Sequence, residues 1–583
     1  MRMSIHKPSE RLITLFEGSF CEKASEVLEK HQVDFDDINF CVFKRPGQHH
    51  ELTLQITSYW LPELVPEWEN VVHDLKLHVD NELSKSGLLD PFDIVVVEII
   101  DPLLVKPKNV GPILDNEQLE AEWPTIKEKV FSILESEEST KGTMNAIAIF
   151  RFGPLRENDK NPITVFISVD PGASDSAWPK LLENIQTYLD TLPHEITVHI
   201  EHNTIDMCAF DLLLPDQSDS RISSRPAYQE RVNFGGDIGP MVYLFDRDGN
   251  KQNSGLGTLG CYVEVRTRKV PTWTRYALTN YHVVRPCFDG FTLNLDNQKD
   301  GKSAYDEKTA PTKGSSCWKA DAKGFGPAQP PQRHEVESPS RRTHNLLVHD
   351  LLQNMGTLNE EYPHQPDKLQ PCQEELECRL AFFDNGRNRL GSLWAGSGFS
   401  RRSDGNQRMD WALVHVQEDR QGSNTLPPSS AWAGNVHRLL FPKAFNVPLK
   451  HSTFYSIRDM KSGDLVYKYG VATGYTSGTY HRYKVDCRIR HDKYMGMRPS
   501  GEFLFVPHET LEIGGTPLFA SNGDSGSVVF NRLGYVIGLL FTGQKPKEST
   551  DTGYALITPI EDVFADIKKF ADGAITDIRI SPW

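Results

Sequence analysis

The sequence lacks an apolar run of the roughly 20 residues that a transmembrane helix needs, so we expect no membrane-spanning segment. Its first residues contain no basic segment followed by an apolar stretch, and we expect no secretory signal. A basic excess is also absent, because the formal net charge is −16. This charge argues against general binding to nucleic acid or to an anionic membrane, and we expect neither as a partner.

Paired cysteines are absent as well. The nine cysteines are scattered without the spacings of a disulfide framework, which is typical of reduced thiols and predicts a cytoplasmic or nuclear location. One stretch gathers histidines and cysteines, but its spacings match no zinc pattern, so we expect no metal and no other cofactor. These residues are His344, His349, His364, Cys372 and Cys378.

At 583 residues the chain is too long for a single core, and we expect several domains. The expected parts are two α+β regions, 1–108 and 109–214, a polar linker, 215–234, and a mostly β region, 235–583. An insertion at about residues 296–382 interrupts the last part; it is polar at first and then favours helices at Asn345–Met355 and Pro366–Phe382.

Both α+β regions follow the order helix, strand, strand, helix, strand, which we interpret as a weak internal repeat. The first is expected at Glu22–His31, Ile38–Phe43, Glu51–Thr57, Pro62–Leu83 and Phe92–Ile100. The second is expected at Trp123–Ser136, Asn145–Arg151, Ile163–Ser168, Trp178–Leu189 and Glu195–Ile200. Each has the size of a small sandwich; alternatively, the two share one sheet. Neither holds a nucleophile, a phosphate loop or a ligand cluster, which favours a structural or partner-binding role.

The segment Ser521–Phe530 contains Gly-Asp-Ser-Gly directly before an apolar strand. Such a turn presents the Ser525 hydroxyl at the end of a sheet, and Gly523 and Gly526 permit a tight backbone and close approach of a substrate. The backbone N–H groups of Gly523 and Ser525 can point at one spot and stabilise an oxyanion. Because a lone serine is a poor nucleophile, the chain must also supply a base and an orienting acid.

His282 is the candidate base, since a strand pattern that begins at Tyr276 runs into it. Asp410 is the candidate acid, because a polar loop ends there and an alternating strand begins. Alone, the histidine could be a packed or surface residue and the aspartate a strand-start residue. Their order, His282, Asp410, Ser525, favours a catalytic triad. Three nearby acids are alternatives for the acid: Asp384, Asp404 and Asp419.

These motifs resemble the chymotrypsin/trypsin-like serine peptidases. Leu278-Thr-Asn-Tyr-His282 is similar to the family's Leu-Thr-Ala-Ala-His, Asp410-Trp-Ala-Leu413 to its Asp-aliphatic-Ala-Leu, and Gly-Asp-Ser-Gly is unaltered. Further similar segments are Lys468–Gly478, Val536–Gly543, Tyr554–Ile560 and a terminal helix at Glu561–Phe570. The resemblance covers roughly residues 235–575 and implies an all-β double β-barrel. The expected fold is therefore a C-terminal trypsin-like domain that is preceded by duplicated α+β regions.

The resemblance implies a serine endopeptidase that cleaves peptide bonds of a protein or peptide substrate through an acyl-enzyme, with the N-terminal domains regulating it or binding a protein partner. It implies a primary pocket without an acid at its base, which favours an apolar or small side chain over Arg or Lys. The pocket residues implied are Phe519, Thr542 and Gly543. The alternative is a catalytically restrained pseudoprotease that acts as an interaction scaffold.

Secreted relatives pair the aspartate before the nucleophile, here Asp524, with a freed N-terminus. An activation sequence such as Ile-Val-Gly-Gly is not found, and Val232–Asp237 resembles one only loosely. We therefore expect an internal partner for Asp524. A non-peptidase acyl hydrolase is disfavoured, because an α/β-hydrolase needs Gly-x-Ser-x-Gly and the order Ser, Asp, His.

Overall fold

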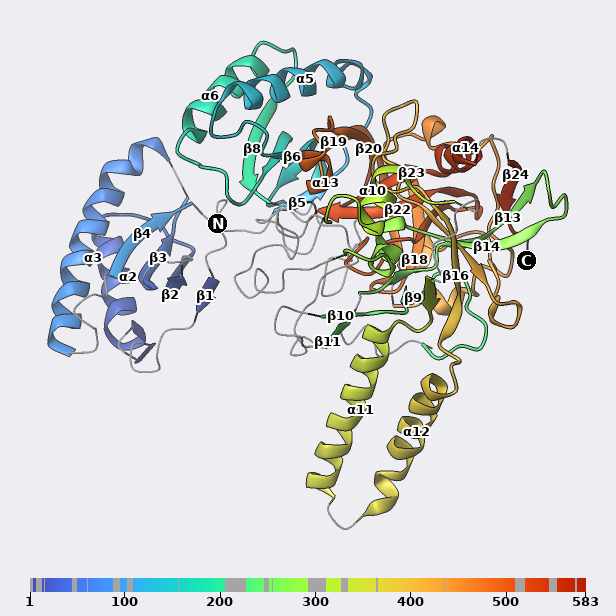
Figure 1. Cartoon of the computed structure of the whole chain (residues 1–583). Coiled ribbons are helices and arrows are strands. Elements are labelled where there is room, and N and C mark those ends of the chain that lie inside the picture. The colour runs from blue at the N-terminus through green and yellow to red at the C-terminus, as the bar shows by residue number, and fades with distance from the viewer. Residues whose placement is uncertain are drawn as a thin grey trace. The chain divides into compact units, whose positions relative to one another are not determined.

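The computed structural model of the chain describes most of its residues (Figure 1). They are 4–6, 13–14, 16–44, 50–59, 61–86, 95–101, 108–155, 157–203, 205, 227–245, 251–253, 255–291, 311–326, 334–362, 365–434, 436–508, 519–544, 553–571 and 574–582. Residues 215–226 of the expected linker, and residues 296–310 and 327–333 of the polar start of the insertion, lie outside the described residues. The chain divides into two compact units: Met1–Lys108 with Gly153–Arg156, and Asn109–Phe152 with Glu157–Trp583.

The first unit is a small α+β sandwich. Its elements are β1 (Ser4–His6), α2 (Cys21–Lys30), β2 (Asp37–Lys44), β3 (His50–Thr57), α3 (Val65–Ser86) and β4 (Val95–Ile100). The sheet order is β1-β2-β3-β4, and β3 and β4 are parallel because α3 carries the chain back between them. Val71, Leu75 and Val79 recur every fourth residue and bury one face of α3.

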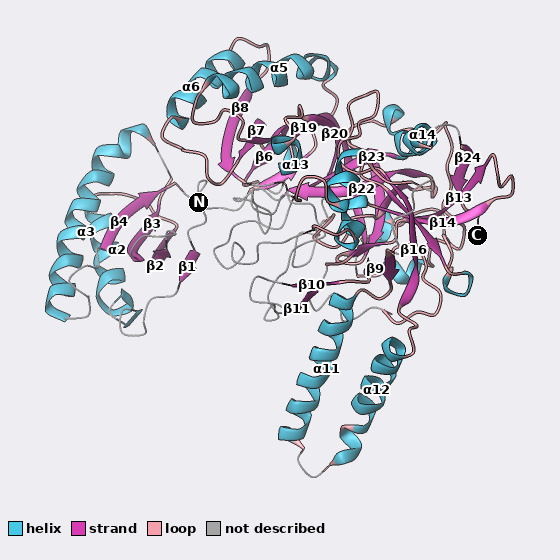
Figure 2. Cartoon of the chain, in the orientation of Figure 1, coloured by secondary structure: helices cyan, strands magenta, loops and turns pink. Residues whose placement is uncertain are grey.

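A second α+β module, residues 109–203, has the same element order. It consists of β5 (Asn109–Gly111), α5 (Glu117–Ser136), β6 (Met144–Gly153), β7 (Ile163–Val169), α6 (Trp178–Leu189) and β8 (Ile196–His202). Strands β6 and β7 are antiparallel and β7 and β8 parallel, as β2, β3 and β4 are in the first unit. Both helices pack on the same face of the strands (Figure 2). The duplication itself stays a prediction.

The second module shares a sheet with the C-terminal region. Strand β6 pairs antiparallel with β19 (Gly474–Cys487), with Asp486 opposite Ile147 and Cys487 opposite Ala146. The face of β6 turned away from the helices packs into one apolar cluster with C-terminal residues such as Phe541. Residues 109–152 and 157–203 are therefore part of the second compact unit.

Six C-terminal strands close into a ring. They are β18 (Leu465–Gly470), β19, β20 (Ser500–Pro507), β21 (Val528–Asn531), β22 (Val536–Gln544) and β23 (Tyr554–Pro559). They pair in the order β18-β21-β22-β23-β20-β19, and an additional β18–β19 pairing completes the circle. The short helix α13 (Arg490–Tyr494) lies between β19 and β20, and α14 (Ile560–Phe570) follows β23.

Eight further strands form one sheet in the order β12-β9-β15-β16-β17-β14-β13-β24. Their bounds are β9 (Asp237–Pro240), β12 (Gly257–Thr258), β13 (Cys261–Thr267), β14 (Thr274–Thr279), β15 (Glu335–Glu337), β16 (Arg389–Gly396), β17 (Ala412–Val416) and β24 (Ile575–Ile580). A separate hairpin joins β10 (Tyr243–Phe245) and β11 (Lys251–Asn253). The expected terminal helix is present as α14 but does not end the fold, because β24 follows it and pairs with β13.

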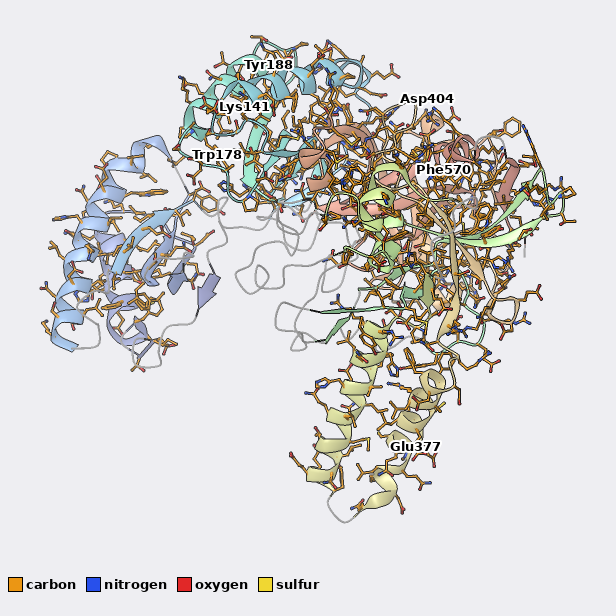
Figure 3. The ribbon with its side chains drawn as sticks, viewed as in Figure 1. Lys141, Trp178, Tyr188, Glu377, Asp404 and Phe570 are labelled. Atoms are coloured by element: carbon orange, nitrogen blue, oxygen red, sulfur yellow. The ribbon has the colours of Figure 1, made fainter. Side chains whose placement is uncertain are left out.

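The insertion contributes three helices, α10 (Ser316–Lys323), α11 (Arg341–Glu361) and α12 (Gln370–Asp384). Helices α11 and α12 run side by side as a hairpin that extends away from the sheets (Figure 1). Glu377 on α12 marks this hairpin (Figure 3). Among the described residues, no helix combines the length and apolar character needed to cross a bilayer.

Candidate active site

The pairing of β14 with β17 brings His282 and Asp410 together. Thr279 stands opposite Ala412, His282 follows on the short helix α8 (Tyr281–Val284), and Asp410 precedes β17. His282 Nδ1 lies 2.5 Å from Asp410 Oδ2, and the His282 backbone N–H donates to Asp410 Oδ1 at 3.0 Å. Since a carboxylate only accepts hydrogen bonds, this geometry places the histidine proton on Nδ1 and leaves Nε2 as an acceptor.

Both side chains are about 1% exposed, and His282 Nε2 has no hydrogen-bond partner among the described residues. The three alternative acids lie elsewhere. Asp404 is fully exposed beside Lys569 on the outer surface (Figure 3), Asp419 pairs with Arg387 at 2.8 Å, and Asp384 is exposed at the end of α12. The structure thus brings Asp410 to His282 and leaves the other three apart.

Ser525 lies in the expected turn before β21. Gly523 and Gly526 adopt φ of +102° and +93°, in the left-handed region that favours glycine. A side chain at residue 526 would also collide with the carbonyl of Thr258. Ser525 is fully buried, and its Oγ donates to the Phe541 carbonyl oxygen on β22 at 3.2 Å. Within the described residues, no hydrogen bond joins Ser525 to His282.

The candidate oxyanion donors are two backbone N–H groups of the serine turn, those of Gly523 and Ser525. Within the described part of the chain, the Gly523 and Ser525 N–H groups donate no hydrogen bond, whereas the Gly526 N–H donates to Leu540 O at 3.0 Å. Two free N–H groups at one turn are what an oxyanion would need. The position of an oxyanion between them stays a prediction.

Thr258 links the turn that carries Ser525 to the strand that precedes His282. The sequence motifs do not predict this role. Its N–H donates to Ser525 O at 2.8 Å and its Oγ1 to Gly523 O at 2.9 Å. Its carbonyl accepts from Thr279 Oγ1 at 2.8 Å, three residues before His282. One buried threonine therefore links the two elements that carry the candidate base and nucleophile.

Asp524 has an internal partner, Lys468 on β18. Their Nζ and Oδ2 atoms lie 3.0 Å apart, and both side chains are fully buried. The carboxylate also accepts from the N–H groups of Ala472 and Thr473 at 2.9 and 3.1 Å, and from that of Ser521 at 3.0 Å. The expectation of an internal partner named no residue, because nothing in the sequence marks Lys468 as buried.

The helix that carries His282 is held by the insertion. Asp321 on α10 receives two hydrogen bonds from Arg285, at 2.8 and 2.7 Å, and one from Tyr281 OH at 2.8 Å. Arg285 and Asp321 are almost fully buried. The insertion thus contributes a buried carboxylate that fixes the residues on both sides of His282.

Of the residues expected to line a pocket, Phe519 and Thr542 are buried and Gly543 is half-buried. Phe519 packs in an apolar cluster with Val529 and Leu540, and its carbonyl accepts from Thr476 Oγ1 at 2.8 Å. Thr542 and Gly543 stand on β22 opposite Leu556 and Ala555 of β23. Their role in specificity stays a prediction.

Comparisons with known proteins give one family match and several similar solved structures. Residues 387–574 match the model of peptidase family S64. This match includes Asp410 and Ser525 but not His282. Among solved structures, a glutamic acid specific serine protease that uses a histidine triad in substrate binding is 12% identical over 60% of this chain and 100% of its own, with a TM-score of 0.25.

Two further similar structures carry names that include their organisms. Thermobifida fusca protease A is 10% identical over 60% of this chain and 100% of its own, with a TM-score of 0.25. Cellulomonas bogoriensis chymotrypsin is 15% identical over 33% of this chain and 81% of its own, with a TM-score of 0.21. The family match supports a peptidase function.

Proposed function

We propose that the chain is a serine endopeptidase that uses His282, Asp410 and Ser525. The observation that carries the proposal is the buried His282–Asp410 pair, whose Nε2 is unpartnered among the described residues, together with a serine in a Gly-Asp-Ser-Gly turn. Asp410 holds the imidazole in the tautomer that accepts a proton at Nε2. The substrate is a peptide bond in a protein or peptide.

The reaction begins when the Ser525 hydroxyl leaves the Phe541 carbonyl and turns to His282 Nε2. Nε2 takes the proton as Oγ attacks the substrate carbonyl, and the N–H groups of Gly523 and Ser525 stabilise the oxyanion. The imidazolium then protonates the leaving amine and an acyl-enzyme remains. Water, activated by the same histidine, releases the acid and restores Ser525.

Burial of Ser525 supports a second candidate, the restrained pseudoprotease. The serine is 0% exposed, so a substrate cannot reach Oγ in this conformation. Either the site opens before catalysis or the domain acts as a scaffold. Residues 1–108 form a separate compact unit and suit a regulatory or partner-binding role in both cases.

The deciding experiment is labelling of the purified full chain with a fluorophosphonate probe. Probe incorporation should disappear in Ser525→Ala and fall sharply in His282→Ala. His437→Ala is a matched control, because His437 is exposed and its Nδ1 accepts from the Leu439 N–H at 3.3 Å. Equal labelling of wild type and Ser525→Ala would refute the nucleophile, and no labelling of either would favour the scaffold.

A further inference from the structure

The loop that carries Asp410 is anchored by a buried arginine two residues earlier. Arg408 and Asp492 on α13 are both fully buried and form an ion pair. The Arg408 N–H donates to Glu502 Oε1 at 2.9 Å, and its carbonyl accepts from Thr558 Oγ1 at 2.8 Å. Among the described residues, the Arg408 guanidinium donates only to Asp492. The position of the loop that carries Asp410 therefore depends on the position of Asp492.

Asp492 also receives Arg402 from the same loop. Arg402 Nη2 lies 2.6 Å from Asp492 Oδ1. Removing the carboxylate would leave one fully buried guanidinium and one mostly buried guanidinium without their partner, which is costly. If α13 shifts, the loop must shift with it or lose its ion pairs with Asp492.

Helix α13 is too short to hold its own position, since it spans only Arg490–Tyr494. The residue after Asp492 fastens it to the second α+β module. Lys493 Nζ donates to Asp170 Oδ1 and Asn145 Oδ1, both at 2.7 Å, and to Thr143 O at 3.1 Å. An ammonium has three protons, and these three acceptors all belong to the module.

We infer that Lys493 and Asp170 are positioning residues for the candidate acid, Asp410. By holding α13 against the module they keep Asp492 where it pairs with Arg402 and Arg408, and thereby keep the carboxylate of Asp410 on His282. The second α+β module then helps to maintain the geometry of the candidate active site. This inference rests on the proposed function, but its central element, the His282–Asp410 hydrogen bond, can be observed without catalysis.

A plain role in holding the module to the C-terminal region is the competing explanation, and the chain offers a matched control for it. Lys127 on α5 pairs with Asp486 on β19 at 2.5 Å, and the two side chains are 10% and 27% exposed. Lys493 and Asp170 are 16% and 33% exposed. Both ion pairs join the same module to the same region, but only the Lys493 pair involves α13.

The experiment compares Lys493→Met with Lys127→Met in the full chain, using a peptide substrate. A misplacement of about 1 Å at an active site can cost about 100-fold. We expect Lys493→Met to lower kcat by about 10- to 100-fold with KM nearly unchanged, and Lys127→Met to leave kcat close to wild type. Lys493→Arg keeps the charge and should recover much of the rate. Urea unfolding should show similar stability losses for the two methionine variants.

A second readout uses the Ser525→Ala background, where no turnover is needed. The proton shared by His282 Nδ1 and Asp410 should give a strongly downfield proton NMR signal, which Lys493→Met shifts or broadens and Lys127→Met does not. Equal effects of the two substitutions on kcat and on this signal would overturn the inference. If wild type neither labels nor cleaves, the proposed function fails, while the signal still decides the inference.

Discussion

The Lys468 ammonium lies 3.0 Å from the Asp524 carboxylate in a pair that is completely buried. Asp524 directly precedes Ser525, and its oxygens also hold the N–H groups of Ser521, Ala472 and Thr473. The carboxylate therefore shapes the turn whose N–H groups would form the oxyanion site. Because the counter-charge comes from inside the fold, the turn needs no freed N-terminus.

Lys468→Met should damage both stability and the serine turn. Breaking a buried pair leaves an uncompensated charge, and we expect a loss of about 3–5 kcal/mol in the free energy of unfolding. Urea unfolding and the rate of fluorophosphonate labelling measure the two effects.

The control for this change is Arg458→Met, since Arg458 pairs with Asp562 at 2.7 Å but is 49% exposed. An exposed pair contributes about 0–1 kcal/mol. If Lys468→Met resembles Arg458→Met in both assays, Asp524 does not depend on its buried partner.

Asp410→Asn should lower peptidase activity by about 10⁴-fold while the fold remains, because the amide favours the wrong histidine tautomer; this magnitude is the one known for the chymotrypsin-like triad. Initial rates on a peptide substrate and circular dichroism test the claim. Asp404→Asn and Asp419→Asn should change little, since the first side chain is fully exposed and the second pairs with Arg387. A comparable defect in either would reassign the acid.

Local patterns were enough to predict the longer elements of the two α+β regions. The helix expected at Trp178–Leu189 has those bounds in the structure, and the strand expected at Ile163–Ser168 is one residue longer. Alternation of buried residues in strands and their fourth-residue recurrence in helices are properties of short segments. The motifs around His282, Asp410 and Ser525 are equally local, which is why the candidate site could be named from the sequence.

Contacts between distant segments could not be predicted in this way. The β6–β19 pairing joins residues more than three hundred positions apart, and no pattern within either strand names its partner. The buried residues of strand β24, Ile575, Ile578 and Ile580, do not follow the regular alternation of a strand. The sequence pattern therefore predicts a helix as the last element of the fold. Lys468 and Thr258 are common residue types whose importance comes from burial beside a particular partner.

His481 on β19 should make the junction between the second module and the ring sensitive to acid. Burial lowers the pKa of His481 to about 4 from an ordinary 6.5, against the opposing effect of its hydrogen bond to Ile149. Nε2 lies 2.6 Å from Ile149 O, and Nδ1 accepts from the Ile113 N–H at 3.3 Å. A proton on Nδ1 would face that donor, so the folded state requires the neutral ring.

The unfolded chain binds this proton at a higher pH than the folded chain does. The neutral His481 ring therefore makes its full contribution to the free energy of unfolding above about pH 6.5. This contribution is lost as the pH falls toward 4, and the total loss is about 3 kcal/mol. Urea unfolding of wild type and His481→Asn across this range isolates the effect. The difference in stability between the two proteins should shrink as the pH falls, and a constant difference would contradict the prediction.

The second α+β module should be required for a stable peptidase, whereas residues 1–108 should not. A chain that begins at Asn109 keeps one compact unit intact and should show the same unfolding transition for that unit and the same labelling rate as the full chain.

A chain that begins at Arg231 loses β6, so the edge of β19 and the apolar cluster around Phe541 and Tyr554 become exposed. We expect this chain to bind a hydrophobic dye, to unfold at lower urea and to label more slowly, because Lys493 loses its three acceptors. Active-site titration with the probe corrects each rate for the folded fraction. A chain from Arg231 that is as stable as wild type and labels faster would instead mean that the module restrains the site.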